Sequence, residues 1–459
     1  MKRWDKKRVV VIGIARQGKA LARYLTNEGA MVVMSDIQTE EKLGPAIAEL
    51  ADLELSYVLG EHPIELLDGT EALFLSGGVP THLPIVQEAK ARDIPVLNDA
   101  QVFIENCPAE VIGITGSAGK TTTTTLVYEM LKLGLEGSEK HAWLGGNIGR
   151  PLLEDLEGIN ARDVVVMELS SFQLELMTVS PRIAALLNLT PDHLDRHGSM
   201  EVYSEAKRQI IASQDENGIA VLGYDDPRTW TLRDQARGGV ISFGYGAPDT
   251  GNAAFVDDGN LVLRTEDQIQ NICRVEDLAL RGPHNVLNIL AACALSSAVH
   301  IAVEDMATVA KNFQGVPHRL EFIRMALGAA WYNDSIATTP DRALAAVRAF
   351  EEPLVVLLGG RDKDLPWDAF AEQVITRARA IILFGEARHM LQEVFQTRLK
   401  DKDVPELHLI ETFEQAFQTA TEVVQSGDVV LLSPGCTSYD EFPNFEARGV
   451  RFIEMVSAL

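Results

Sequence analysis

The sequence predicts an α/β protein of three domains. Its 459 residues correspond to about three domains at roughly 150 residues each. Hydrophobic residues make up 46% of the chain and charged residues 23%, which is the balance of a globular protein. Short runs rich in Val, Ile and Leu alternate with helix-like stretches, a pattern typical of parallel doubly wound sheets. We place the domains at 1–107, 108–316 and 317–459.

The first domain is predicted to be Rossmann-like. A β-branched run at 9–13 is followed by a helical stretch at 19–28 and a second strand at 31–36. Further strands are expected at 73–77 and 95–98. This alternation of strand and helix indicates a parallel sheet with crossover helices.

The central domain is predicted as a P-loop ATPase-like α/β unit. A strand at 111–115 runs into a glycine-rich turn and a helix at 121–132, and strands follow at 164–168 and 183–188. Between 218 and 280, short strands with turns such as Asp257-Asp-Gly-Asn260 predict a small antiparallel side sheet. A helix at 285–299 closes the unit. The third domain is again predicted to be Rossmann-like, with strands at 354–360, 380–385 and 428–433.

Charge and cysteine usage exclude several classes of protein. The chain carries 41 Lys and Arg against 66 Asp and Glu, a formal net charge of -25, which opposes general binding to nucleic acid or to an anionic membrane. Cys107, Cys273, Cys293 and Cys436 are isolated, so neither a disulfide framework nor a zinc site is indicated. No apolar run reaches the roughly 18 residues of a spanning helix. We expect a soluble cytoplasmic protein.

The strongest local signal is the segment Thr115-Gly-Ser-Ala-Gly119-Lys120-Thr121, which lies between a strand and a helix. Backbone N–H groups and the helix dipole favour phosphate at such a place. Lys120 is expected to neutralise the β- and γ-phosphates and Thr121 to bind Mg²⁺. Because Ile114 stands where the strict P-loop has glycine, this is a variant mononucleotide loop. The alternative is a glycine-rich turn without a ligand.

A weaker signal is the turn from Gly13 to Gly18, followed by Asp36 at the end of the next strand. It resembles a dinucleotide fingerprint, but Ala15 replaces the middle glycine and its Cβ obstructs a close approach by pyrophosphate. The turn favours a nucleotide or its diphosphate over NAD. The alternative is a tight turn that needs two glycines, with a solvated Asp36.

Polar residues follow two central strands. Glu168 ends one of them, and the segment 188–197, which contains His193, follows the other. Ligands gather at the carboxyl ends of parallel strands, so both loops are expected beside the phosphate loop. A lone Glu168 is otherwise a solvated residue or a helix cap, and His193 has an equally good structural interpretation. From composition alone, Lys207 is an ordinary exposed helical lysine.

Taken in order, the segments 115–121, 145–149, 168–175, 188–196, 284–285, 318–319, 333–335 and 433–449 resemble the Mur ligases over essentially the whole chain. Within the family, 168–175 and 433–449 are similar to members that add D-glutamate. The resemblance implies an ATP-dependent ligase that joins D-glutamate to UDP-N-acetylmuramoyl-L-alanine through an acyl phosphate, with one or two Mg²⁺, in peptidoglycan precursor synthesis. A monomer is expected. The alternatives are a related Mur or folylpolyglutamate-type ligase using another amino acid such as L-glutamate, and a non-catalytic nucleotide-gated binding protein.

The resemblance also implies roles for individual residues. The ATP-binding residues are Gly116, Ser117, Ala118, Gly119, Lys120, Thr121, Thr122, Asn285, Asn288, His318, Arg319 and Asp334. The residues that bind the UDP-linked substrate are Gly13, Arg16, Gln17, Asp36, Ile37, Ser76, Gly77, Gly78 and Asn147. The D-glutamate residues are Thr338, Lys363, Ser438 and Phe445. The catalytic residues are Lys120, Glu168, His193 and Lys207, and the metal ligands are Thr121, Glu168, His193 and, if carbamylated, Lys207.

Three positions depart from the family pattern. Ile336 stands where the family usually has a lysine, so one cation near the phosphates or the incoming amino acid is missing. Ser76-Gly77-Gly78 replaces the usual Ser-Pro-Gly beside the UDP site, and Ile37 follows Asp36 where a hydroxyl residue is common. These departures affect the expected substrate contacts and leave the ATP chemistry unchanged.

Overall fold

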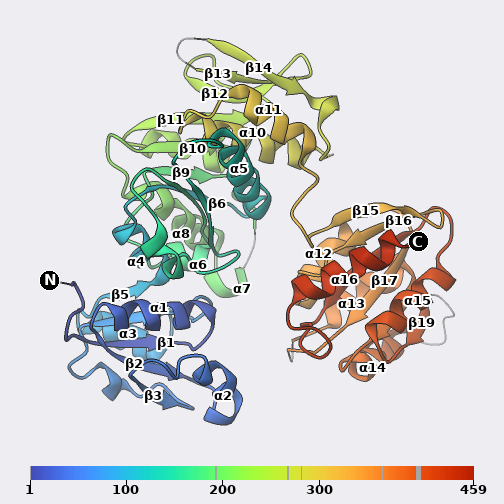
Figure 1. The fold of residues 1–459 in the computed structure, drawn as a ribbon, viewed down its shortest axis with the longest axis horizontal. Helices are drawn as coiled ribbons and strands as arrows, with labels where there is room; N and C mark the ends of the chain where they lie inside the picture. Colours follow the sequence, from blue (N-terminus) through green and yellow to red (C-terminus); the bar gives the residue numbers. More distant parts are fainter. Residues whose placement is uncertain (1, 192–193, 266–267, 281, 364, 400–404) are drawn as a thin grey trace. The chain divides into compact units, whose positions relative to one another are not determined.

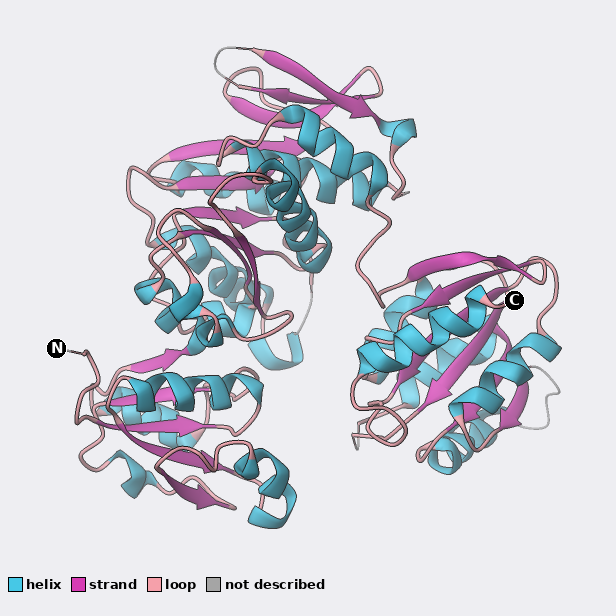
Figure 2. Ribbon diagram, viewed as in Figure 1, coloured by secondary structure: helices cyan, strands magenta, loops and turns pink. Residues whose placement is uncertain are grey.

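The computed structural model describes residues 2–191, 194–265, 268–280, 282–363, 365–399 and 405–459. The chain folds into two compact units, Met1–Phe313 and Gln314–Leu459, which contain three largely parallel sheets (Figure 1). Helices cover the strands of each sheet (Figure 2). The α/β prediction is therefore confirmed. The proposed boundary near 107 falls within the first unit, between two separate sheets, and the domain limits stay predictions.

The N-terminal sheet is parallel throughout, in the order β3-β2-β1-β4-β5. Its strands are β1 (Arg8–Ile12), β2 (Met31–Asp36), β3 (Leu55–Leu59), β4 (Ala72–Leu75) and β5 (Val96–Asn98). Its helices are α1 (Arg16–Asn27), α2 (Glu40–Ala48), α3 (Pro84–Ala91) and α4 (Asp99–Asn106). Alternate residues of β1 enter two different apolar cores, as expected for a strand covered by helices on both faces.

The central sheet has the order β14-β13-β12-β11-β10-β9-β6-β8-β7. Its strands are β6 (Glu110–Thr115), β7 (Ala142–Gly146), β8 (Val164–Glu168), β9 (Ile183–Leu186), β10 (Ile219–Gly223), β11 (Gly239–Gly244), β12 (Asn252–Asp257), β13 (Asn260–Arg264) and β14 (Ile269–Arg274). Its helices are α5 (Lys120–Gly134), α6 (Ser171–Leu174), α7 (Leu194–His197), α8 (Met200–Ala212), α9 (Pro227–Trp230), α10 (Pro283–Ser297) and α11 (Val303–Asn312).

The antiparallel strands predicted between 218 and 280 do not form a separate sheet. β12 pairs in parallel with the edge of β11, β13 pairs antiparallel with β12, and β14 pairs antiparallel with β13. The β12–β13 hairpin turns at Asp258 and Gly259, which have φ of 44° and 75°. Positive φ at both central residues matches the twist of the flanking strands. The hairpin was therefore readable from the Asp-Gly sequence, whereas its attachment to the main sheet was not.

The C-terminal sheet has the order β15-β16-β20-β17-β18-β19, and only β15 is antiparallel to its neighbour. Its strands are β15 (Glu321–Ala326), β16 (Ala329–Asn333), β17 (Leu354–Gly359), β18 (Ala378–Phe384), β19 (Glu406–Leu409) and β20 (Val429–Gly435). Its helices are α12 (Pro340–Arg348), α13 (Asp368–Arg377), α14 (Arg388–Leu399), α15 (Phe413–Val423) and α16 (Phe445–Ser457).

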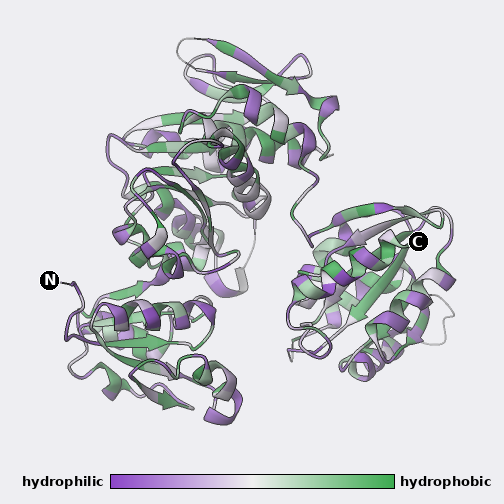
Figure 3. Ribbon diagram, in the orientation of Figure 1, coloured by the Kyte–Doolittle hydropathy of each residue, from purple (hydrophilic) through white to green (hydrophobic). Residues whose placement is uncertain are grey.

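Hydrophobic residues concentrate in the inner strands of the sheets (Figure 3).

Short 3₁₀ helices complete the fold: η1 (Ile64–Leu67), η2 (Leu152–Glu154), η3 (Leu156–Gly158), η4 (Thr231–Gln235) and η5 (Val275–Asp277). None of the described helices combines the length and apolar character that crossing a bilayer requires.

The register of the central sheet brings the predicted chemistry to one edge. Ile114 pairs with Glu168, and Thr115 pairs with Leu186. The phosphate loop, the end of β8 and the segment after β9 therefore leave the sheet side by side. The apolar β6 lies between β8 and β9, so the loop starts from an interior strand of the sheet.

Candidate active site

The phosphate loop joins β6 to the 15-residue helix α5. Gly119 caps the helix with φ +83°, and a Cβ at this position would lie 2.2 Å from Asn288 Oδ1. Only glycine fits both the backbone conformation and this close approach to α10. Asn188 holds the loop from the other side, accepting from Ala118 N at 2.8 Å and donating to Ala118 O at 3.1 Å. These contacts fix the shape of the predicted phosphate loop at the N-terminus of α5, where the helix dipole favours an anion.

Lys120 places its ammonium group over this loop. Its Nζ donates to the carbonyl oxygens of Gly116 at 2.8 Å and Ser117 at 3.0 Å. The Ser117 hydroxyl donates to Thr190 O at 2.8 Å and accepts from Tyr203 OH at 2.9 Å. A positive charge therefore stands at the mouth of an anion-binding turn. Thr122, in the first turn of α5, is half-buried.

Glu168 lies at the end of β8 and accepts two side-chain hydrogen bonds. Thr121 Oγ1 donates to Oε2 at 2.8 Å, and Asn147 Nδ2 donates to Oε1 at 2.9 Å. The carboxylate is 2% exposed. A hydroxyl and a carboxylate in contact at the start of a phosphate-binding helix are oxygen donors of the kind that Mg²⁺ prefers, so Thr121 and Glu168 fit this ion.

The remaining predicted ligands are less well defined. His193 lies outside the described residues. Among the residues that the structure describes, no group of three or more His, Cys, Asp and Glu side chains is placed to hold a metal. Of the predicted metal ligands that the structure describes, Thr121 and Glu168 are in direct contact, and their role in metal binding stays a prediction.

Lys207 is buried, and its interpretation as an exposed helical lysine was wrong. It is 1% exposed, and its Nζ donates to Gly116 O at 2.8 Å and Thr115 Oγ1 at 3.2 Å. The ammonium lies 5.0 Å from the centre of the Tyr203 ring. Tyr203, Ala206, Lys207 and Ile210 form the buried stripe of α8, and this spacing puts Lys207 on the face that packs against the sheet.

The start of α10 lies beside the loop. Asn288 is buried, accepts from Thr123 Oγ1 at 3.4 Å and donates to Asn285 Oδ1 at 3.3 Å. Both predicted adenosine or phosphate residues of the first unit are thus next to the phosphate loop. Their signal in the sequence was their place in the family motif.

The turn after β1 is fastened by Asp36. The carboxylate accepts from Ile14 N at 2.8 Å and from Gln38 N at 2.9 Å, so Asp36 is more than a solvated side chain. A Cβ on Gly18 would lie 1.9 Å from Gly13 O, which explains the two glycines sterically. Ile37 is 66% exposed.

The loop after β4 packs against the same turn. Gly18 N donates to Ser76 Oγ at 3.1 Å, and a Cβ on Gly77 would lie 1.8 Å from Gln17 Oε1. Gly13, Gln17, Ser76 and Gly77, all predicted to bind the UDP-linked substrate, therefore lie close together. Asn147 donates its amide to Glu168, and Arg16 of α1 donates to the carbonyl oxygen of Gly149, two residues after Asn147.

Burial shifts the pKa of two residues of the second unit, Asp334 and His318, in opposite directions. Asp334 Oδ2 accepts from Ser433 Oγ at 2.7 Å and Oδ1 from Leu320 N at 3.1 Å, and burial raises the pKa of this carboxyl to about 7. Burial lowers the pKa of His318, whose Nδ1 is 2.9 Å from Asn333 Nδ2. The positive charge of Arg319 acts on Asp334 in the opposite direction to burial.

The predicted D-glutamate residues all follow strand ends in the second unit. Lys363 Nζ donates to Thr338 Oγ1 at 3.4 Å. Ser438 is buried, with its carbonyl oxygen accepting from Phe442 N at 2.8 Å. Phe445 begins α16, and its carbonyl oxygen accepts from Ser335 Oγ at 2.8 Å. Only Lys363 and Thr338 are in direct contact within this set.

Arg448 was not predicted. It is 1% exposed, and its guanidinium donates to Ser335 Oγ and to the carbonyl oxygens of Ser335, Gly359, Cys436 and Thr437 at 3.0–3.5 Å. It joins the ends of β16, β17 and β20. Nothing in the local pattern of α16 distinguishes it from an exposed helical arginine.

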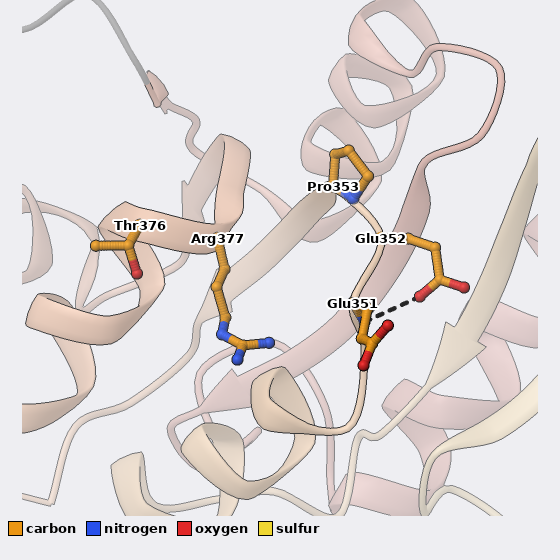
Figure 4. Close-up of a pocket in the computed structure, with 5 residues that line it drawn as sticks. All are labelled: Glu351, Glu352, Pro353, Thr376 and Arg377. Atoms are coloured by element: carbon orange, nitrogen blue, oxygen red, sulfur yellow. Dashed lines mark hydrogen bonds between the residues drawn. The ribbon is translucent and has the colours of Figure 1, made fainter.

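A cavity of about 550 Å³ lies elsewhere in the second unit (Figure 4). Its lining residues are Glu351, Glu352, Pro353, Thr376 and Arg377. Pro353 and Arg377 directly precede β17 and β18, so the cavity is at the amino ends of these strands. The predicted site residues are at the carboxyl ends, and the cavity is therefore separate from them.

Comparison with known proteins gives three family matches along the chain: the Mur ligase MurD-like N-terminal domain at 7–98, the Mur ligase middle domain at 114–296 and the Mur ligase glutamate ligase domain at 318–436. UDP-N-acetylmuramoylalanine--D-glutamate ligases of Clostridium botulinum (strain Kyoto / Type A2) and Clostridium novyi (strain NT) are each 38% identical over 455 residues, which cover 99% of this chain and 97% of the relative. The chain belongs to the Mur ligase family.

Solved Mur ligases share the fold of this member. MurC from Thermotoga maritima aligns with a TM-score of 0.52 at 20% identity, covering 98% of this chain and 99% of that one. MurF from Acinetobacter baumannii aligns with a TM-score of 0.54 at 17% identity, covering 97% and 93%. The family membership and the three-domain α/β fold predicted for this Mur ligase are confirmed.

Proposed function

We propose that this Mur ligase is an ATP-dependent, amide-forming enzyme that adds D-glutamate to UDP-N-acetylmuramoyl-L-alanine in peptidoglycan precursor synthesis, with release of ADP and phosphate. The observation that carries the proposal is the contact of Thr121 with Glu168 at a phosphate loop. The names of the relatives, which are 38% identical over 99% of the chain, support D-glutamate as the amino acid.

The first step is phosphoryl transfer. A carboxylate oxygen of the substrate's L-alanine attacks the γ-phosphorus, the bond to the β-phosphate oxygen breaks, and an acyl phosphate and ADP result. Lys120 and the N-terminus of α5 stabilise the negative charge on the phosphoryl oxygens. Mg²⁺, when bound by Thr121 and Glu168, supplies further charge neutralisation. Lys120 already lies over the loop, so its amine has only to turn outward from Gly116 and Ser117.

The second step forms the amide. The free amine of D-glutamate attacks the acyl carbon, gives a tetrahedral intermediate and expels phosphate, while the amine loses its proton. We assign Thr338, Lys363, Ser438 and Phe445 to D-glutamate, because they cluster at strand ends where α/β proteins bind ligands. Lys363 supplies a positive charge for a carboxylate of the amino acid.

The amine of Lys207 is assigned to carbamylation. Attack of the neutral amine on CO₂ forms an N–C bond and releases a proton, which converts a buried cation into a carboxylate-like anion beside Thr115. The anion supplies the negative charge that a metal site with Thr121, Glu168 and His193 requires. A ¹³C carbamate resonance from protein incubated with ¹³C-bicarbonate, absent in Lys207→Arg, tests this assignment.

Product analysis tests the reaction itself. The purified chain is incubated with Mg-ATP, UDP-N-acetylmuramoyl-L-alanine and either D- or L-glutamate. We expect one amide product, one ADP and one phosphate per turnover with D-glutamate only, and no product from Lys120→Ala. Product with L-glutamate alone would identify a related ligase. No product with either enantiomer, despite ATP binding, would favour a binding protein.

We place this activity in the cytoplasm, where ATP and UDP-linked precursors are made, and in a monomer. Light scattering coupled to size exclusion then gives a mass close to the 50.3 kDa of one chain. A mass of twice this value would contradict the monomer.

A further inference from the structure

Arg196 of α7 joins the N-terminal glycine loop to the segment that follows Glu168. Its guanidinium carbon lies 4.3 Å from the centre of the Phe172 ring, and its Nη2 donates to Gly78 O at 3.3 Å. Gly78 belongs to the loop assigned to the UDP-linked substrate. Phe172 stands four residues after Glu168. One side chain therefore contacts both the loop assigned to the substrate and α6, the helix that follows the strand ending in Glu168.

The Phe172 ring is held firmly, so its position is linked to the backbone beside Glu168. The imidazole of His197 stacks on the ring with centroids 5.1 Å apart and an interplanar angle of 3°, and its Nε2 is 3.0 Å from Ser171 Oγ. Ser170 and Gln173 form a reciprocal capping box at the start of α6. Such a box fixes the first turn of a helix, and Ser170 is only two residues from Glu168.

We propose that Arg196 is a positioning residue that couples occupancy of the UDP-substrate loop to the placement of Glu168. Substrate bound at 76–78 fixes the carbonyl of Gly78, which fixes the guanidinium on the Phe172 ring and, through α6, the end of β8. Glu168 is then held toward Thr121 when the first substrate is present. The proposal rests on the proposed function, since it assigns a task to Arg196 within that reaction.

The contact between the two sheets does not depend on Arg196 alone. Asn98 Nδ2 donates to Gln173 O at 2.8 Å, Thr81 Oγ1 to Glu175 Oε1 at 2.7 Å, and Gln101 Nε2 to Thr178 Oγ1 at 2.9 Å. Arg196 itself is exposed. A substitution of this side chain therefore removes the coupling while the junction and the fold stay in place.

Steady-state kinetics of Arg196→Met and Arg196→Lys test the proposal. Met keeps the length and apolar contact of the side chain but has neither the charge nor the donor, whereas Lys keeps both. Arg162→Met is the matched control, because Arg162 precedes the opposite end of β8 and pairs at 3.1 Å with Glu139. The measured quantities are kcat, the KM of each substrate, the Mg²⁺ concentration at half-maximal rate and the Tm.

For Arg196→Met we expect the KM of the UDP-linked substrate and the half-maximal Mg²⁺ concentration each to rise about tenfold, with the KM of ATP and the Tm unchanged. Arg196→Lys recovers most of the loss, and Arg162→Met matches the wild type. A coupling role also requires that Phe172→Leu and Arg196→Met be non-additive. A Mg²⁺ requirement unchanged in Arg196→Met, or additive effects of the two substitutions, would overturn the proposal.

Failure of the proposed function is distinguishable from failure of this inference. Absence of amide product from the wild type contradicts the function. Calorimetric titration of the UDP-linked substrate into wild type and Arg196→Met, with Mg²⁺ and a non-hydrolysable ATP analogue present, still measures the coupling. Equal affinities in that titration would contradict the role of Arg196 whatever the wild type catalyses.

Discussion

Thr121 donates its hydroxyl hydrogen to Glu168 across 2.8 Å, and this contact ties the first turn of α5 to the end of β8. The two residues are 47 positions apart in the sequence, yet both follow strands that pair directly in the central sheet. The register of β6 with β8 therefore brings the Thr121 hydroxyl to the Glu168 carboxylate, the pair that we propose binds Mg²⁺.

Removing that hydroxyl tests the metal assignment. We expect Thr121→Val to lower kcat by about 100-fold and to raise the Mg²⁺ requirement, because a preorganised ligand of transition-state charge is lost. Thr121→Ser keeps the oxygen and retains most activity. Rates measured over a range of Mg²⁺ concentrations separate the two variants. A Thr121→Val enzyme with wild-type Mg²⁺ dependence would exclude Thr121 as a ligand.

Gly119 provides a test of the loop geometry. In Gly119→Ala the new Cβ meets Asn288 Oδ1 at 2.2 Å in a residue with φ +83°, so both collision and backbone strain oppose the substitution. Gly137→Ala is the control, since φ is +77° there and nothing lies within 4 Å. We expect Gly137→Ala to cost about 1 kcal/mol of stability and Gly119→Ala clearly more. Gly119→Ala also weakens ATP binding, measured by titration calorimetry.

Asp99 makes the first unit sensitive to pH. It is the first residue of α4, its Oδ1 has no hydrogen-bond partner, and burial raises its pKa to about 6. A carboxyl whose pKa is raised on folding binds its proton more tightly in the folded state. The contribution of Asp99 to the free energy of unfolding is therefore most favourable near pH 4 and is lost as the pH rises through 6. Full ionisation of the buried carboxyl lowers this free energy by about 2–3 kcal/mol.

The comparison of Asp99→Asn with the wild type isolates this contribution. We expect the thermal transition of the variant to lie above that of the wild type at pH 8 and the difference to vanish toward pH 4. Glu54→Gln removes an exposed carboxyl and serves as the control. A constant difference between Asp99→Asn and wild type across this pH range would contradict the assignment.

The local sequence pattern was enough to predict the strands and loops that contain the candidate site residues. The runs at 31–36 and 164–168 coincide with β2 and β8, because buried parallel strands are continuous apolar segments ended by polar residues. Burial within helices was harder to infer. Lys207 and Arg448 have ordinary helical neighbours, and their acceptors are backbone carbonyls and one hydroxyl each, all contributed by distant segments. Such acceptors leave no trace in side-chain identity, so neither residue's environment followed from local sequence.

We expect Arg342 to supply the positive charge that the family resemblance leads one to expect at Ile336. Ile336 is half-buried, and its N–H donates to His318 O at 3.1 Å. Its side chain is apolar and contributes no charge. Arg342 lies in the first turn of α12, and its positive charge lowers the pKa of Asp334, against the larger effect of burial. It also lowers the pKa of Lys363, for which partial desolvation is the larger cause. The charge of Arg342 therefore acts on Asp334 and on Lys363, one of the residues predicted to bind D-glutamate.

We expect Arg342→Gln to raise the KM of D-glutamate about tenfold or more, since a charge-assisted hydrogen bond to a carboxylate contributes about 1.5–3 kcal/mol. The KM of ATP stays near the wild-type value. Adding Ile336→Lys to Arg342→Gln restores much of the affinity, because a lysine then returns at the position where the family carries one. If the double variant binds D-glutamate no better than Arg342→Gln, a cation at position 336 does not replace the cation at position 342. If Arg342→Gln instead leaves the KM unchanged, Lys363 alone meets the carboxylates.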